Sequence, residues 1–222
     1  EPVKIKVGNN YQGGLDIRST YLRRLNIGNQ CGAHISMEVC VCYQDVMVGN
    51  GYHADIKLNN VFARRVYLGN EFSGYITARS ANARYGIRKM WVGDDFSGHI
   101  DFSSHPTIEQ VNVGRNATGV AEFISCPDLK LVKFDSAFSG EVNLSESGIV
   151  YVRAYEPCSA VFNCQECKAL TLLKMPLQNP FSIVGAKKPL AIRKKGKYVF
   201  YILKKQKLST QYFSSVWKRI VR

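Results

Sequence analysis

Cysteine is the first residue type in this sequence that could bind a metal. The chain of 222 residues holds seven cysteines, so at least one has no partner within the chain. Cys164-x-x-Cys167 has the spacing of half a zinc site, and its other half would have to come from Cys126 or Cys158. Free cysteine is also among the most commonly buried residue types. We therefore interpret the cysteines as core residues and predict no metal and no cofactor.

Carboxylates are the second group that could do chemistry. A solenoid enzyme acting on polysaccharide would need clustered carboxylates or a Ca²⁺ site, and the best candidates are Asp94, Asp95, Asp101 and Glu122. Asp94 and Asp95 stand where Gly-Asn corners recur elsewhere in the chain, so a turn explains them. The four histidines are scattered, and no acid, base and nucleophile converge. We predict that the protein is not an enzyme and assign no catalytic residue; a carbohydrate-active β-helix is the third alternative.

These side chains are positioned by a repeat of about 20 residues. We define column zero by the aliphatic or Met residues that open each repeat: Ile5, Leu25, Val46, Val66, Met90, Val111, Val132 and Val152. Residues two, ten and twelve places later are mostly apolar, and eight places later only Gly or Ala occurs. The period-two runs predict two short strands in each repeat.

One repeat of this length cannot bury its own apolar face, whereas stacked repeats can, because each column then contacts itself in the next coil. The sequence predicts a mainly β fold, a solenoid of about nine coils whose ninth opens near Leu173. Val66, Met90 and Val111 should be vertical neighbours. The recurring Gly-Asn pairs predict corners with positive φ. The small residue eight places after column zero is expected where a side chain would collide with the adjacent coil.

The repeat resembles short leucine-rich repeats of the bacterial and protist BspA-like type. The likeness is carried by Leu129-x-x-Val132-x-Phe134 through Phe138-Ser139-Gly140-x-Val142-x-Leu144, by the matching run from Ile87 to Ser103, and by junctions such as Cys126-Pro127-x-Leu129. It covers roughly residues 5 to 176. The Asn ladder of standard leucine-rich repeats is kept only at Asn10 and Asn116, and a right-handed parallel β-helix is the alternative fold. The resemblance implies recognition of other macromolecules along one face, and it favours a secreted or cell-surface location.

The columns on either side of column zero should point out of the first sheet. Met47, Tyr67 and Trp91 then form a contiguous exposed stripe, flanked by Arg65 and Lys89. Large aromatic side chains and arginine are typical of interface hot spots. Farther along the same two columns lie Arg153 and Tyr151. We predict that these residues bind a partner, most simply a protein, or else a glycan. The outward positions of the second strand are more polar and predict a solvated face.

The last quarter of the chain differs from the rest in charge. Residues 168–222 hold 14 Lys and Arg and no acidic residue, so they carry the whole net charge of +13. The sequence predicts a solenoid over residues 1–180 and a basic cap over 181–222, with strands at 181–184, 190–192 and 198–203, a hairpin through 194–197 and an amphipathic helix after Thr210. The candidate anion-binding residues of this tail are Lys194, Lys195, Lys197, Lys204, Lys205, Lys218 and Arg219.

The sequence thus favours a non-enzymatic binding scaffold that recognises a protein, or a glycan, along one sheet face. The alternative is a structural protein associated with RNA or ribonucleoprotein and docked by its basic tail. An anionic membrane surface is a further candidate partner for the tail. No segment has the length and apolar character of a transmembrane helix.

Overall fold

The protein is built from two β-sheets in a computed structural model that describes residues 2–81, 86–155 and 157–170, together with the backbone of four later strands. The larger sheet contains β1 (Val3–Val7), β3 (Tyr21–Ile27), β5 (Val41–Val48), β7 (Phe62–Leu68), β9 (Ile87–Val92), β11 (Gln110–Val113), β13 (Leu131–Phe134), β15 (Tyr151–Ala154), β17 (Leu172–Lys174), β19 (Leu190–Lys194) and β20 (Lys197–Tyr201). The smaller sheet contains β2 (Leu15–Arg18), β4 (Ile35–Glu38), β6 (Ile56–Asn59), β8 (Tyr75–Arg79), β10 (His99–Asp101), β12 (Val120–Glu122), β14 (Glu141–Asn143), β16 (Val161–Asn163) and β18 (Ser182–Val184).

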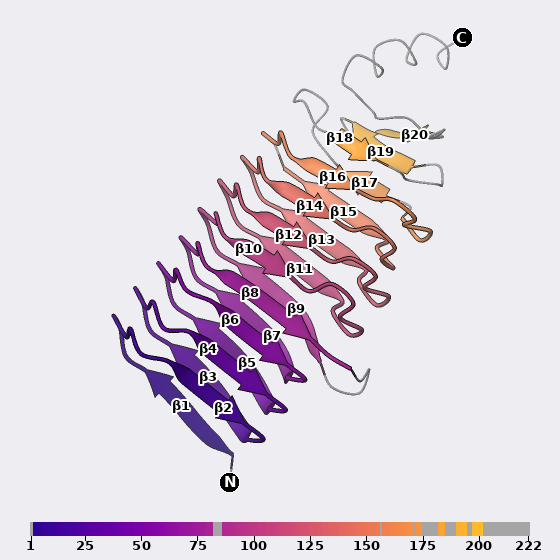
Figure 1. The fold of residues 1–222 in the computed structure, drawn as a ribbon. Helices are drawn as coiled ribbons and strands as arrows, with labels where there is room; N and C mark the ends of the chain where they lie inside the picture. Colours follow the sequence, from indigo (N-terminus) through magenta and orange to yellow (C-terminus); the bar gives the residue numbers. More distant parts are fainter. Residues whose placement is uncertain are drawn as a thin grey trace, which may run out of the picture.

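Successive strands from β1 to β18 alternate between the two sheets, so each coil contributes one strand to each. Neighbouring strands within a sheet are parallel through β19, and the coils form an elongated stack with the N-terminus at one end (Figure 1). Met90 pairs with Val66 on one side and with Val111 on the other, as the repeat predicts. The predicted β-solenoid is confirmed, and β17 opens its predicted ninth coil, with Leu173 paired to Val152.

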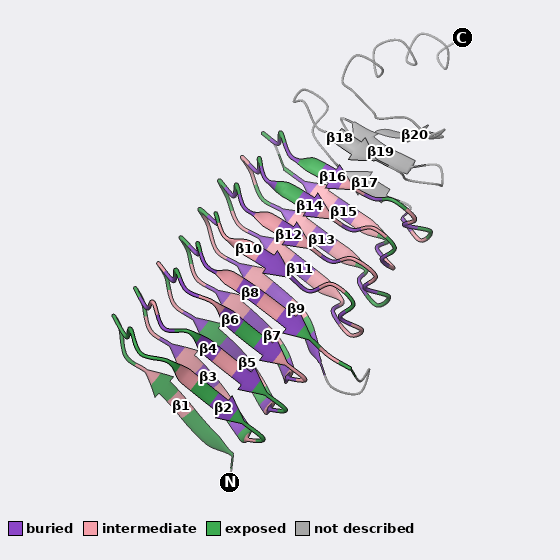
Figure 2. Ribbon diagram, in the orientation of Figure 1, coloured by how far each residue is buried: buried purple, intermediate pink, exposed green. Residues whose placement is uncertain are grey.

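The core lies between the two sheets and is formed by residues that repeat from coil to coil. Val66, Met90 and Val111 have no solvent-exposed surface. The rings of Tyr52, Phe72 and Phe96 stack in successive coils, with centroid separations of 5.7 and 6.2 Å. Figure 2 shows buried and more exposed residues alternating along the strands of both sheets. This alternation places every second side chain of a strand on the outer face.

The corners differ from the prediction in which residue takes the positive φ. In the coil that starts with β3, Gly28 is not the residue with positive φ; Gln30, two places later, has φ 55°. Gly28 is required by packing, because a Cβ there would lie 2.6 Å from the carbonyl carbon of Gly8. The asparagine of each pair accepts a backbone N–H from the next coil, as Asn29 does from Asn50 at 2.9 Å. The prediction for the small residue eight places after column zero is confirmed: a Cβ on Gly74 would lie 2.0 Å from the Ala54 carbonyl oxygen.

Both sheets continue past residue 180. β18 pairs in parallel with β16, and β19 pairs in parallel with β17. The predicted hairpin is present, since β19 and β20 are antiparallel and Lys194 lies opposite Lys197. The predicted helix after Thr210 lies outside the described residues, as do Lys195, Lys204, Lys205, Lys218 and Arg219. A search of the described residues found no helix long and apolar enough to cross a membrane.

Candidate binding face on the larger sheet

The predicted stripe on the larger sheet is present, and we call Met47, Tyr67 and Trp91 the aromatic strip. β5, β7 and β9 are in register here, with Met47 paired to Tyr67 and Tyr67 paired to Trp91. The rings of Tyr67 and Trp91 stack with centroids 5.0 Å apart and planes inclined by 18°. Met47 is 38% exposed, and the two rings are half-buried. Three apolar side chains therefore form one contiguous surface on a rigid, hydrogen-bonded sheet.

A buried carboxylate orders the arginines beside the strip. Arg65 donates from Nε to Asp45 Oδ1 over 2.8 Å and from a terminal nitrogen to Oδ2 over 3.2 Å. Arg24 approaches the same carboxylate from the preceding coil at 3.8 Å. Asp45 is only 4% exposed. Its hydrogen bonds raise the pKa of Arg65, whose guanidinium carbon lies 5.6 Å from the centroid of the Tyr67 ring.

Asp45 is buried although its column points outward. The pairing between β5 and β7 shifts register between Cys42 and Asp45, and from there Asp45 lies opposite Arg65 on the outward face. Its carboxylate binds the Arg65 guanidinium and lies 3.8 Å from Arg24, so two arginine side chains lie against it. The sequence predicted the outward column of Asp45 but not its burial.

The other residues predicted to bind on this face lie in two separate places. Lys89 lies beside Arg65 as its register partner, next to the strip. Arg153 and Tyr151 lie on β15, and the column of Arg153 reaches Trp91 only through Lys133 and Asn112. The guanidinium carbon of Arg153 lies 4.1 Å from the centroid of the Tyr155 ring. The structure thus places Arg153 and Tyr151 on the same face but not in contact with the aromatic strip.

The outward face of the smaller sheet carries an ion-pair cluster that the sequence analysis treated as a solvated surface. Asp101, only 7% exposed, accepts hydrogen bonds from Arg79 (3.0 Å) and from the hydroxyl of Tyr75 (3.4 Å). Burial alone would raise the pKa of Asp101, but hydrogen bonds from Arg79 and from the Ser103 backbone outweigh it and lower that pKa to about 2. The sequence feature that could have predicted this cluster is the presence of opposite charges, Arg79 and Asp101, in adjacent coils.

The four carboxylates considered for catalysis all have partners. Asp94 accepts two hydrogen bonds from the guanidinium of Arg115, which lower its pKa. Asp95 has φ 60° and accepts a hydrogen bond from Asn116, so both aspartates belong to a corner, as predicted. Asp101 is held by Arg79, and Glu122 lies 2.9 Å from His99 Nε2. Each carboxylate therefore serves a contact between neighbouring coils.

All seven cysteines are buried and free of disulfides, which fits their predicted core role. Within the described residues, no group of three or more His, Cys, Asp or Glu side chains could hold a metal. Cys167 donates to the Leu144 carbonyl over 2.8 Å, and its hydrogen bond with Cys164 lowers the pKa of Cys167. Burial raises the pKa of Cys126 to about 12, so this thiol stays protonated at neutral pH.

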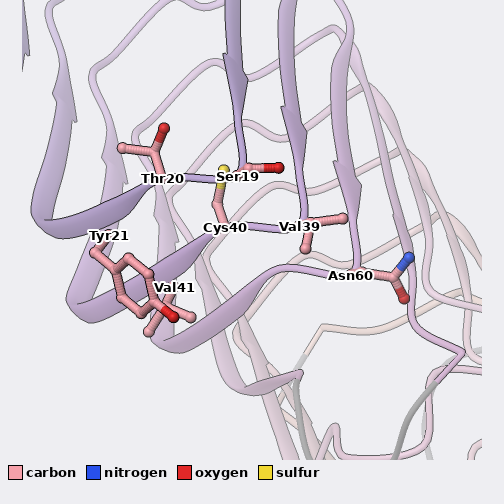
Figure 3. Close-up of a pocket in the computed structure, with 7 residues that line it drawn as sticks. All are labelled: Ser19, Thr20, Tyr21, Val39, Cys40, Val41 and Asn60. Carbon is pink, nitrogen blue, oxygen red and sulfur yellow. The ribbon is translucent and has the colours of Figure 1, made fainter.

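A pocket of about 550 Å³ lies at the corner between the sheets in the first coils, and no pattern in the sequence predicted it (Figure 3). It is lined by Ser19, Thr20, Tyr21, Val39, Cys40, Val41 and Asn60. Its lining contains no charged side chain. Tyr21 also stacks on Tyr43 with ring centroids 6.4 Å apart, which forms a second exposed aromatic pair near this pocket.

The chain was compared with known proteins. No protein-family model, no curated protein and no solved structure matched it.

Proposed function

We propose that this protein is a non-enzymatic binding scaffold that recognises a protein or glycan partner along the outward face of the larger sheet. The observation that carries the proposal is the aromatic strip, in which Tyr67 stacks on Trp91 and Met47 continues the surface. Partly exposed aromatic side chains on a rigid support lose little conformational entropy when a partner covers them. The resemblance to short leucine-rich repeats supports the same role.

The charged groups beside the aromatic strip favour a preorganised recognition surface. Arg65 is held by two hydrogen bonds to buried Asp45, so its position is fixed before a partner arrives. Preorganised side chains bind with a smaller entropic cost than mobile ones. Lys89 lies next to Arg65 and has no carboxylate partner among the described residues, which leaves its charge available to a ligand.

Affinity capture with matched variants tests this function. The full chain is immobilised and exposed to native lysate as the wild type, as Tyr67→Ala/Trp91→Ala and as Tyr21→Ala/Tyr43→Ala. The last variant removes another exposed stacked aromatic pair from the same sheet, outside the strip. We expect the strip variant to lose specific capture and the Tyr21/Tyr43 variant to retain it.

Circular dichroism and thermal unfolding verify that both variants keep the fold. Equal capture by the wild type and the strip variant would remove the proposed function.

A further inference from the structure

Charge is distributed very differently over the two sheet faces. On the smaller sheet, cationic groups face carboxylates: Arg18 lies 3.0 Å from Asp16, and Arg79 is paired with Asp101. The two outward columns of the larger sheet contain one acidic residue, Asp45, which is already paired. Their basic residues are Lys4, Lys6, Arg24, Arg65, Lys89, Lys133 and Arg153. The larger sheet therefore presents a cationic face, although residues 1–167 are close to neutral as a whole.

Basic residues on this face lie directly beside one another in adjacent strands. The register pairs Lys4 with Arg24 and Arg65 with Lys89. A third pair joins Lys133 to Arg153. Like charges at directly opposed positions destabilise a sheet. Asp45 offsets this for the first two pairs through Arg24 and Arg65, whereas Lys133 and Arg153 have no ion-pair partner among the described residues. A bound anion would relieve that repulsion.

The three pairs follow the long axis of the stack. They lie on β1 and β3, on β7 and β9, and on β13 and β15, so consecutive pairs are three coils apart. With strands spaced by about 4.8 Å, the pairs recur about every 14 Å along a face of about 34 Å. The first two pairs lie in the column before column zero and the third lies in the column after it, both on the outward face. A linear ligand that runs along the axis and crosses from one column to the other would meet all three, with the aromatic strip beside the central pair.

Unpartnered polar atoms gather on the same face. Among the described residues, five side-chain nitrogen or oxygen atoms are shielded from solvent and have no hydrogen-bond partner. Four belong to this face: Nε of Arg24 and of Arg153, Oδ1 of Asn26 and Nδ2 of Asn112. Buried polar groups are normally hydrogen-bonded. Because the four atoms are shielded from solvent, a ligand contacts them only where their side chains move as it binds.

From these observations we infer that the partner is a linear glycan bearing carboxylate or sulfate groups, bound along the cationic face of the larger sheet. This inference rests on the proposed function of that face. The cations neutralise the anionic groups, and the ring edges of Tyr67 and Trp91 contact the apolar face of a sugar.

Two other polyanions fit the face less well. Single-stranded nucleic acid binds by stacking bases on aromatic faces, but Tyr67 and Trp91 cover each other's facing surfaces. Protein interfaces deplete charged residues at their centre and place them at the rim. Here basic residues recur along the whole length from β1 to β15, which favours a ligand whose own charges repeat along a line.

Fluorescence anisotropy with defined probes tests the inference. The full chain is titrated against labelled heparin and labelled polygalacturonate, with neutral dextran, oligo-dT and poly-L-glutamate as comparison probes at equal charge or mass. We expect both anionic glycans to bind and dextran not to bind. Heparin alone would assign sulfate as the recognised group, and polygalacturonate alone would assign carboxylate.

Charge-matched variants separate the sheet face from the basic tail. Lys89→Glu/Lys133→Glu should weaken glycan binding about tenfold or more, because two cations of the face are reversed. Lys204→Glu/Lys205→Glu makes the same change in net charge within the basic tail and should weaken it less than about twofold. Thermal unfolding verifies that the face variant remains folded.

The inference is overturned if oligo-dT or poly-L-glutamate binds more tightly than both glycans, or if only the tail variant loses binding. If neither glycan binds while capture of a protein still depends on Tyr67 and Trp91, the glycan inference is wrong and the proposed function stands. If neither glycan binds and protein capture does not depend on Tyr67 and Trp91, both the glycan inference and the proposed function are wrong.

Discussion

At the scale of single residues, Asp45 organises the candidate binding face. It is buried, accepts two hydrogen bonds from Arg65 and lies 3.8 Å from Arg24. Removing one partner of a buried charge pair leaves the other uncompensated, and this costs more than the pair itself contributes. Because both arginines are partly exposed, water offsets part of that cost.

We expect Asp45→Asn to lower the free energy of unfolding by about 2 kcal/mol, because Arg65 loses its charged acceptor. Urea denaturation at neutral pH measures the loss. Asp55→Asn is the matched control, since Asp55 is half-exposed and lies 3.8 Å from exposed His34; its effect should stay within about 0.5 kcal/mol. Equal effects from the two variants would mean that Asp45 does not organise the face.

His105 makes the stability of the fold depend on pH. It is 1% exposed, accepts a hydrogen bond from the Ile87 backbone N–H, and packs against Phe102. Burial and, to a smaller extent, the positive charge of Arg79 lower the pKa of His105 from 6.5 to about 4. As the pH falls below 6.5, the unfolded chain binds a proton at this site while the folded chain does not. This contribution to stability therefore falls between about pH 6.5 and pH 4 and is constant below that range.

The difference in the pKa of His105 between the unfolded and the folded chain corresponds to about 3 kcal/mol in the free energy of unfolding. Urea denaturation across this pH range measures that free energy. We expect His105→Leu to remove most of the decline between pH 6.5 and pH 5, where few carboxylates titrate. His53→Leu, at an exposed position, should keep the decline. A wild-type decline that persists unchanged in His105→Leu would contradict the assignment.

At the scale of the elements, the recurrence of apolar columns explains where the strands form. Close approach of backbone atoms between coils explains why certain corner positions are glycine. A Cβ on Gly140 would lie 2.0 Å from the Gly119 carbonyl oxygen of the preceding coil. Backbone cannot yield as a flexible side chain can, so the two coils would have to separate locally. At Gly8, on the exposed first coil, nothing lies within 4 Å of the same atom.

Gly140→Ala should therefore lower the free energy of unfolding by about 3 kcal/mol, through overpacking between coils. Gly8→Ala should change it by less than about 0.5 kcal/mol. Chemical denaturation of the two variants provides the comparison. If Gly140→Ala were as mild as Gly8→Ala, the close stacking of corners would be wrong.

The repeat made the register of the elements predictable, because column zero recurs about every 20 residues and a one-residue slip would turn its apolar side chains outward. It predicted that Tyr67 and Trp91 are neighbours, and they are. It did not predict the burial of Asp45, because a column assigns a face but not which neighbouring side chains, here Arg24 and Arg65, lie against a residue. The contact of Arg79 with Asp101 was also missed, because a column assigns a face but not the direction in which a long side chain extends.

At the scale of the whole molecule, the two sheets have separate roles in this account. Cross-coil ion pairs join Arg79 to Asp101 and His99 to Glu122 on the smaller sheet. On the outward columns of the larger sheet, Asp45 is the single carboxylate among seven basic residues, and the aromatic strip lies beside them. The near-neutral charge of residues 1–167 conceals this difference, because the sum averages over the faces. The difference in charge between the two sheets is found only when each residue is assigned to a sheet face.

Hydroxyl-radical footprinting of the full chain, with and without its captured partner, tests the central claim most directly. Met47, Tyr67 and Trp91 on the larger sheet and Tyr75 and His99 on the smaller sheet are all oxidisable and partly exposed. Binding should protect the first three about threefold or more and leave the other two unchanged, because only the larger sheet is covered. Protection of Tyr75 and His99, with the aromatic strip still open to oxidation, would contradict the account.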